Sequence, residues 1–322
     1  MSTGAGRRPS QPQVPEWVRR WPGVCMGVGA LAVSASAVLL HLAHVSPGTA
    51  SFYRCVLALP LLVPLALAER RHGRPGRRTV ALAWAAGVLL AGDMLLWTQA
   101  IPEAGAGIST VVVNMQVLLV PLLALVVDRE SPGRRFALAL PLLLAGLVLT
   151  AGLVGGAMGT DPLTGALHAV MAAACYSGFL FLLRRTGEGG LTRQTYLHVI
   201  VAAAVASLAI GAVWHGVDLA PGWSPIGWLL AVAVLGQVLG WLLVALATPS
   251  LPAHVGATLL LLTPVGAVGL GAIVLAERPT LVQLAGCALI LASGYLAATR
   301  PSGDHREPDR LSPDERSGAN SL

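Results

Sequence analysis

Two charged side chains of opposite sign lie well inside apolar segments of the sequence. Arg54 occurs within ASFYRCVLALPLL and Asp93 within GVLLAGDMLLWTQA. At a helical rise of about 1.5 Å per residue, they fall roughly 9 and 12 Å below the outer ends of their segments. A charge at the centre of a membrane helix costs about 2.5–3.5 kcal/mol on insertion scales, so it usually has a partner or a function. Three interpretations stay open: a structural ion pair, an outer gate, and a carboxylate that couples transport to protons.

A set of uncharged polar residues is predicted near the middle of the apolar segments. Asn114 and Gln237 lie roughly 15 and 18 Å from the outer ends of their segments. Tyr176 and Thr263 fall at similar depth. Gln116 lies about 200° around the helix from Asn114, so we assign Asn114 to a central pathway and Gln116 to helix–helix hydrogen bonding. The alternative for each side chain is a purely structural contact between helices.

The same spacing of a polar residue and a tryptophan occurs in both halves of the chain. Trp97 follows Asp93 by four positions, and Trp241 follows Gln237 by four. Residues four apart share one face of a helix. The candidates for a substrate pathway are therefore Asp93, Trp97, Asn114, Tyr176, Gln237, Trp241 and Thr263. Arg54 and Asp93 are in addition the candidates for a gate or for coupling.

The composition is that of a membrane protein. Of 322 residues, 55% are hydrophobic and 11% charged, and the mean hydropathy is +0.72; soluble domains carry about 25% charged residues. The net charge of +6 comes from arginines in short loops and tails, which favours membrane orientation over nucleic-acid binding. The four cysteines stand singly in apolar segments, and no metal, nucleotide or serine-hydrolase motif occurs. We expect no cofactor, no metal and no enzymatic activity.

Ten apolar segments of about 20 residues each predict an all-α integral membrane protein, because that is the length a bilayer requires. Residues 1–22 and 300–322 are predicted to be polar tails. The predicted membrane segments are 23–43, 48–68, 79–100, 104–127, 136–153, 163–183, 194–214, 225–247, 252–275 and 280–299.

Arginine placement predicts the orientation. The arginines lie in the N-terminal tail and after the second, fourth and sixth segments, whereas the intervening loops have none before Arg278. Positively charged loops stay in the cytoplasm. With ten segments, both termini are then cytoplasmic, and the protein is a multi-pass protein of the cell (inner) membrane.

The two halves of the chain are related by a repeat with an offset of 147 residues. Pro102 aligns with Pro249, and Glu-x-Pro at 130–132 aligns with Glu-x-Pro at 277–279. Each half, 23–153 and 163–299, has five segments. An odd number means that the halves cross the membrane in opposite senses, which is the inverted repeat of many secondary transporters. Pro121 and Pro264 are each expected to free a backbone carbonyl one turn earlier.

The chain resembles the drug/metabolite transporter superfamily, of the EamA type. The resemblance lies in ASFYRCVLALPLL and in LTPVGAVGLGAIVLAERPTLVQLAGCALILASG, where Pro264, Glu277, Gly286 and Gly294 match the family pattern. In the first half the pattern is looser, with Ala139 in place of a glycine. The resemblance implies ten helices in two repeats, with a pathway between segments one, three, four, six, eight and nine. It also implies transport of small metabolites, commonly the efflux of amino acids.

We therefore expect a secondary transporter that exports amino acids, related polar or amphipathic solutes or drugs by alternating access. Its partners would be a small-molecule substrate, the lipid bilayer and protons, and a homodimer stays open. The alternative is a structural or assembly protein of the same fold that has no transport cycle. A membrane enzyme is disfavoured because no catalytic cluster is visible in the sequence.

Overall fold

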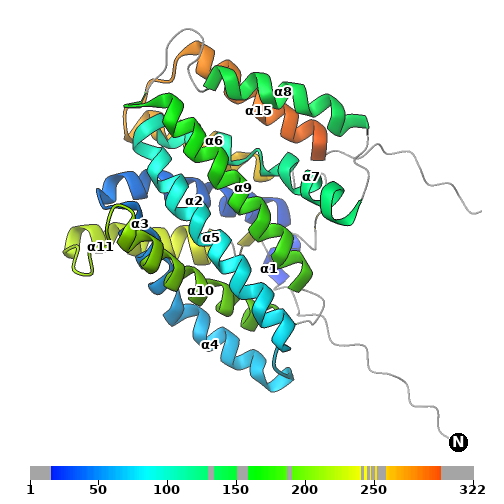
Figure 1. The fold of residues 1–322 in the computed structure, drawn as a ribbon, viewed down its shortest axis with the longest axis vertical. Helices are drawn as coiled ribbons and strands as arrows, with labels where there is room; N and C mark the ends of the chain where they lie inside the picture. Colours follow the sequence, from blue (N-terminus) through cyan, green and yellow to red (C-terminus); the bar gives the residue numbers. More distant parts are fainter. Residues whose placement is uncertain are drawn as a thin grey trace, which may run out of the picture.

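The computed structural model describes residues 16–129, 134–150, 159–186, 191–240, 243–244, 247, 251 and 259–298. Every regular element in these ranges is a helix, which confirms the predicted all-helical class (Figure 1). The elements of the first half are α1 (Glu16–Arg20), α2 (Pro22–Ala43), α3 (Pro47–Val56), α4 (Leu59–Glu69), η1 (Arg70–His72), α5 (Arg77–Ala104), α6 (Ala106–Val113), α7 (Gln116–Asp128) and α8 (Arg134–Thr150). Those of the second half are α9 (Pro162–Thr186), α10 (Thr192–Val213), α11 (Trp223–Ala231), η3 (Val232–Gly240), α14 (Leu262–Val274) and α15 (Leu281–Ala298).

Seven helical stretches of the described chain are long and apolar enough to cross a membrane. They are Pro22–Ala43, Pro47–Glu69, Arg77–Ala104, Ala106–Asp128, Pro162–Leu183, Arg193–Val213 and Trp223–Gly240. Three shorter apolar helices, Ala137–Thr150, Leu262–Val274 and Leu281–Leu296, overlap the predicted fifth, ninth and tenth segments. The membrane class is thus confirmed with seven candidate crossings, and the number ten stays a prediction.

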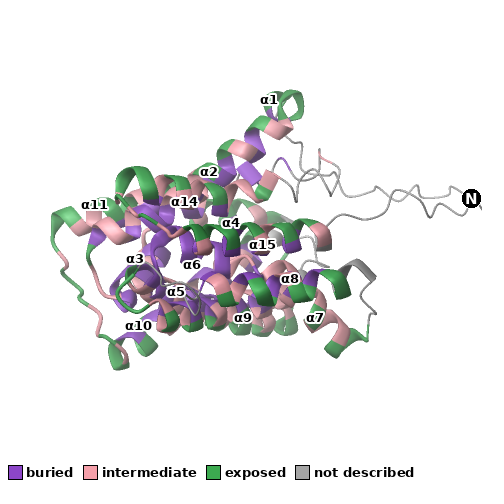
Figure 2. Cartoon of the chain, turned by 90° about the horizontal axis from the view of Figure 1, so that it is seen from above, coloured by how far each residue is buried: buried purple, intermediate pink, exposed green. Residues whose placement is uncertain are grey.

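The surface of the helical bundle is apolar, as lipid contact requires. Val126, Ile273 and Leu281 are 71%, 82% and 85% exposed. Figure 2 shows buried residues gathered toward the interior of the bundle and exposed residues on its outer faces. Large apolar side chains on the outside would aggregate in water, but they are the favourable choice against lipid tails.

Two of the predicted membrane segments are interrupted near their middle. In the second segment, α3 ends at Val56 and α4 begins at Leu59, with Pro60 in its first turn, where a missing N–H costs nothing. In the fourth segment, the chain leaves the α-helix at Asn114–Met115, where the Met115 N–H donates to the Val112 carbonyl three residues back, at 3.0 Å. Each break lies where polar or charged side chains were predicted to face the interior.

The eighth segment changes helix type instead of breaking. The α-helix α11 passes directly into η3, a π-helix of nine residues that contains Gln237. Wider π-helical turns are uncommon and occur often at functional sites, because they displace one side chain relative to its neighbours.

Pro121 and Pro102 both lie inside helices. Pro121 lies inside α7, and the interruption of that segment comes earlier, at Asn114–Met115. Pro102 lies in the last turn of α5, which continues to Ala104, so that only Gly105 separates α5 from α6. Gly105 has a φ of 96°, which only glycine adopts readily. Pro249 and the first Glu-x-Pro, at 130–132, lie outside the described residues.

Close helix packing relies on small residues. Helix α5 packs against α9 and α10, and α8 lies beside α15 (Figure 1). At the α8–α15 contact, a Cβ added to Gly286 would lie 2.7 Å from the Gly146 carbonyl oxygen. Lipid gives no hydrophobic drive for association, so such backbone contact at small residues is what holds membrane helices together.

Candidate functional site

Arg54 lies in a buried hydrogen-bonded chain that joins the two halves. Its Nε donates to Gln237 Oε1 at 3.0 Å, and Gln237 Nε2 donates to the Tyr196 hydroxyl, also at 3.0 Å. Arg54 is 9% exposed and Gln237 is 5% exposed. Arg54 comes from α3, Gln237 from the π-helix η3 and Tyr196 from α10. A buried charge-assisted contact therefore connects residues 183 positions apart.

The face of α5 that carries Asp93 and Trp97 lies against this chain. The guanidinium carbon of Arg54 is 5.5 Å from the centre of the Trp97 ring, within the range of a cation–π contact. Trp97 Nε1 and Asp93 Oδ1 are buried and have no hydrogen-bond partner among the residues that the structure describes. The site therefore presents one unpaired donor and one unpaired acceptor, a helical turn apart on one face.

Arg54 and Asp93 do not form the ion pair that was one of the three interpretations of the sequence. In the described part of the chain, ion pairs join Glu103 to His168 and Asp128 to Arg185. The Arg54 Nε donates to Gln237, and its two terminal nitrogens make no hydrogen bond or ion pair among the described residues.

Two other predicted pathway residues, Tyr176 and Asn114, each contact a residue of their own helix. The Tyr176 ring stacks on Phe179 with 5.7 Å between centroids. Asn114 Nδ2 donates to the Thr110 carbonyl of its own helix at 2.8 Å. Thr263 contacts helix α2. Trp241 lies outside the described residues.

Helix α2 contacts α14 through hydroxyl groups. Thr263 Oγ1 donates to the Ala30 carbonyl at 3.4 Å, and Ser34 Oγ donates to the Thr263 carbonyl at 2.8 Å. Ser34 Oγ also lies 2.9 Å from the Ala30 carbonyl. The helix–helix hydrogen bond expected of Gln116 is not made by its Oε1, which is buried and unpaired in the described structure.

At one end of the bundle, Glu277 contacts the start of α6. Glu277 Oε1 accepts the Ala106 N–H at 2.6 Å, and Oε2 accepts the Gly107 N–H at 3.3 Å. Both oxygens of this Glu-x-Pro acid are therefore bound to another helix, not to α15. Instead, the start of α15 is capped by Thr280 and Gln283, whose side chains bond each other's backbone N–H. Glu277 is thereby available to the other half.

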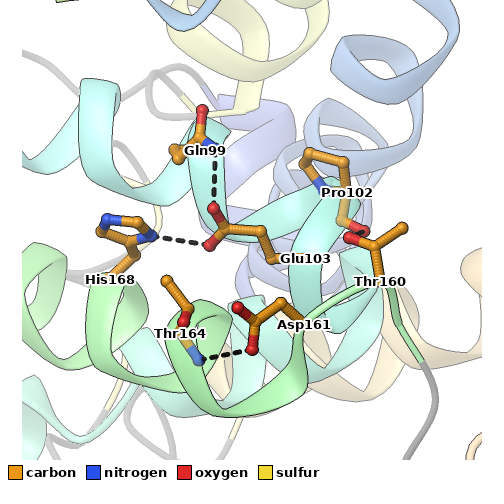
Figure 3. Close-up of polar contacts among 7 residues, drawn as sticks. All are labelled: Gln99, Pro102, Glu103, Thr160, Asp161, Thr164 and His168. Atoms are coloured by element: carbon orange, nitrogen blue, oxygen red, sulfur yellow. Dashed lines mark hydrogen bonds and ion pairs between the residues drawn. The ribbon is translucent and has the colours of Figure 1, made fainter.

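Glu103 anchors a second polar cluster at this end, between α5 and α9 (Figure 3). Gln99 Nε2 donates to Glu103 Oε1 at 2.6 Å, and His168 Nδ1 lies 2.6 Å from Glu103 Oε2. The Glu103 and His168 side chains are 13% and 22% exposed. Both residues stand at the predicted outer ends of their segments, where a charged pair keeps access to water.

The loop before α9 is bound to the end of α5 in the same cluster. Thr160 Oγ1 donates to the Pro102 carbonyl at 3.1 Å, and Asp161 Oδ1 accepts the Thr164 N–H at 3.3 Å (Figure 3). Asp161 thus caps α9, a helix that starts with Pro162. These contacts hold the start of α9 against the end of α5.

Tyr196 and Ser34 contact predicted pathway residues but were not themselves selected from the sequence. Tyr196 lies close to the predicted inner end of its segment, so depth gave no reason to choose it. A tyrosine hydroxyl inside an apolar helix needs a partner, and that rule is the signal that would have identified it. Ser34 stands among small residues and carries no spacing signal. No group of three or more His, Cys, Asp or Glu in the described chain is placed to hold a metal ion.

Comparison with curated proteins gives relatives in one bacterium. The threonine/homoserine exporters RhtA of Salmonella typhimurium strains SL1344 and LT2 are each 37% identical to this chain over 142 residues. The match covers 44% of this chain and 47% of each exporter, so the chain spans about half the length of the curated relatives it matches.

Comparison with solved structures and family models extends over most of the chain. One protein of known crystal structure shares 18% sequence identity and superimposes with a TM-score of 0.56, covering 87% of this chain and 96% of that one. At that identity the likeness concerns the fold alone. The model of the EamA-like transporter family matches residues 21–152 and again residues 163–299. The chain is a multi-pass membrane protein, and it belongs to the EamA-like transporter family.

Proposed function

We propose that this protein is a secondary transporter that exports small amino acids or closely related polar solutes by alternating access. Family membership supports transport, and the relatives named as threonine/homoserine exporters support amino acids as the substrate class. In alternating access, two halves rock around a site near the middle of the membrane.

The observation that carries the proposal is the bond between Arg54 and Gln237. It joins a helix of the first repeat to the π-helix of the second, both side chains are more than nine-tenths buried, and the unpaired groups of Asp93 and Trp97 lie beside it. A buried polar site at the junction of two inverted halves is where such transporters bind their solute. A buried polar group without a partner costs about 1–3 kcal/mol, and a bound solute would satisfy the unpaired groups of Asp93 and Trp97.

The proposed topology has ten membrane helices in two inverted repeats, at 23–153 and 163–299, between cytoplasmic tails at 1–22 and 300–322. The seven candidate crossings and the three shorter apolar helices overlap all ten predicted segments. The arginine distribution supports cytoplasmic termini in the cell (inner) membrane. Under this topology, the Glu103 and Glu277 contacts lie on the outer side.

The pathway is proposed to be lined by the residues selected from the sequence: Asp93, Trp97, Asn114, Tyr176, Gln237, Trp241 and Thr263. Arg54 is the proposed gate residue. Asp93 is the proposed proton carrier, because it is the one carboxylate that the sequence places well inside a membrane segment. A homodimer would be compatible with this topology, because the broad apolar outer surface can contact a second copy as well as lipid.

Solute counterflow tests the proposal. The purified protein is reconstituted into vesicles loaded with unlabelled L-threonine, and entry of labelled L-threonine is followed. Transient accumulation above the level in protein-free vesicles is expected. If no amino acid and no other polar solute of a broad panel exchanges, the transport proposal fails and the non-transporting alternative replaces it.

A further inference from the structure

We infer that Arg54, Trp97 and Asp93 form a recognition site for a zwitterion, with the carboxylate of the solute at Arg54 and Trp97 and its ammonium group at Asp93. The inference rests on the proposed transport function and adds to it the chemical feature that is recognised. Nothing in the likeness to other exporters assigns these roles to these residues.

The position of the solute carboxylate is assigned from the N–H groups of Arg54 that have no partner among the described residues. The guanidinium of Arg54 spends its Nε on Gln237, and Gln237 in turn is held by Tyr196. The terminal N–H groups have no partner among the described residues, and together they form the planar fork that binds a carboxylate in two places. Because the Nε bond and the Trp97 ring fix the guanidinium, little side-chain freedom remains to be lost on binding.

Trp97 adds a further donor to the same end. Its Nε1 is buried and unpaired within the described chain, and its ring lies 5.5 Å from the Arg54 guanidinium carbon. Buried indole N–H groups normally have an acceptor. An anionic oxygen held by Arg54 would supply that acceptor.

The cationic end is assigned from Asp93. Its side chain is 8% exposed, and its Oδ1 is buried and without a hydrogen-bond partner in the described structure. It lies one helical turn from Trp97 on the same face of α5. An ammonium group has three donors and is the natural partner of such an oxygen.

Charge balance favours a zwitterion over a simple ion. Arg54 and Asp93 together carry no net charge when both are ionised, and they do not neutralise each other by direct contact. A solute with only an ammonium or only a carboxylate would bring an uncompensated charge into a buried site and leave one protein group unpaired. A solute with both groups satisfies both residues.

The experiment is competition against L-threonine counterflow by two half-ligands. One is the amino alcohol obtained by reducing the threonine carboxylate, and the other is 3-hydroxybutyrate, which lacks the ammonium group. Hydrogen bonds to charged groups correspond to a discrimination of about tenfold to about 150-fold. Each half-ligand is therefore expected to compete at least about tenfold more weakly than threonine.

Two variants separate the two ends. Trp97→Phe keeps an aromatic ring beside Arg54 but removes the indole N–H together with part of the ring surface. It should weaken threonine binding about tenfold, and it should weaken binding of the amino alcohol, which has no carboxylate, by less. Asp93→Asn should abolish the preference for threonine over 3-hydroxybutyrate. Ser207→Ala is the control, because it removes a buried, unpaired hydroxyl of α10 that belongs to neither end, and it should keep wild-type preferences.

The outcomes distinguish this inference from the transport proposal. If threonine exchanges but both half-ligands compete equally well, or if both variants keep the wild-type preferences, the zwitterion site is wrong and transport stands. If only a solute without both charges exchanges, the site is again wrong. If nothing exchanges, the proposed function and this inference fall together. If both variants fail to fold, the competition measured on the wild-type protein decides alone.

Discussion

The Glu277 carboxylate accepts the Ala106 N–H at 2.6 Å, and this contact joins the two halves of the chain. The first N–H groups of a helix have no partner within it, and they carry the positive end of the helix dipole. Gly271 makes the contact sterically feasible, since a Cβ there would collide with the Glu277 carboxylate. Gly107 packs directly on the backbone of Val268, at 2.7 Å from an added Cβ to the Val268 Cα. The start of α6 and the end of α14 are thus fixed together.

Replacing Glu277 by Gln should destabilise the protein by about 0.5–2 kcal/mol, as losses of helix caps do. The amide keeps one acceptor oxygen but loses the negative charge that the helix terminus favours. The measurement is the free energy of unfolding in detergent. Glu16→Gln is the control, because it removes the same charge from an exposed position in the first turn of α1. Equal stability of the two variants would show that the Glu277 cap contributes nothing.

The coupling between Arg54 and Gln237 can be measured with a double-mutant cycle. Arg54→Met and Gln237→Met should each destabilise the protein, and the double variant should lose about 1.5–3 kcal/mol less than the sum, because the pair is buried and charge-assisted. The cycle uses unfolding free energies under one detergent condition. Additive losses would mean that the 3.0 Å contact carries no net energy. The exchange Arg54→Asp with Asp93→Arg should not restore stability, since Asp93 is not the partner of Arg54.

The sequence allowed us to predict how deep a residue lies along its membrane helix. It did not allow us to predict which neighbouring helix the side chain contacts. Depth and spacing selected Arg54, Asp93, Trp97 and Gln237, and the structure brings Arg54, Trp97 and Gln237 into contact. Opposite charge at similar depth also suggested an Arg54–Asp93 ion pair, and that is not formed. Which side chain Arg54 contacts depends on how each helix is rotated about its own axis. A helix that is apolar on all sides gives little sequence information about that rotation.

Contacts between the halves were equally hard to predict. The Glu-x-Pro repeat was visible, but nothing local indicated that Glu277 reaches a helix 170 positions away. The π-helix at Gln237 likewise leaves no mark in the sequence, because its wider turns are imposed by packing. By contrast, the interruption of the second segment near Pro60 follows a local rule, since proline has no N–H to donate to the carbonyl four residues earlier.

Gly286→Ala should lower the thermal unfolding midpoint. The added Cβ would lie 2.7 Å from the Gly146 carbonyl oxygen and 2.8 Å from the Thr150 nitrogen, so α8 and α15 must move apart. Overpacking of this kind costs about 1–3 kcal/mol. Gly227→Ala is the matched control, because a Cβ there meets nothing within 4 Å and α11 gains a better helix former. An unchanged midpoint for Gly286→Ala would show that the two helices are not in close contact.

The Glu103–His168 pair should contribute little to stability. Its side chains are 13% and 22% exposed, and Glu103 keeps the bond from Gln99 when the histidine is removed. Partly solvated pairs contribute up to about 1 kcal/mol. His168→Ala is therefore expected to lower the unfolding free energy by less than about 1 kcal/mol, and His168→Gln, which restores a donor, by less still. A loss above about 2 kcal/mol would mean that the pair is an essential tie between α5 and α9.

Asp93→Asn should abolish flux driven by a pH gradient. Coupling requires a group that takes up a proton on one side of the membrane and releases it on the other, and an amide cannot do so. Asp93→Glu keeps the carboxylate and should retain part of the driven flux. This variant separates loss of the proton carrier from a change in the packing of the side chain at position 93. The measurement is solute movement in vesicles with an imposed pH gradient, compared with exchange in its absence. Unchanged driven flux in Asp93→Asn would remove this carboxylate from the coupling mechanism and leave it only the recognition of the solute.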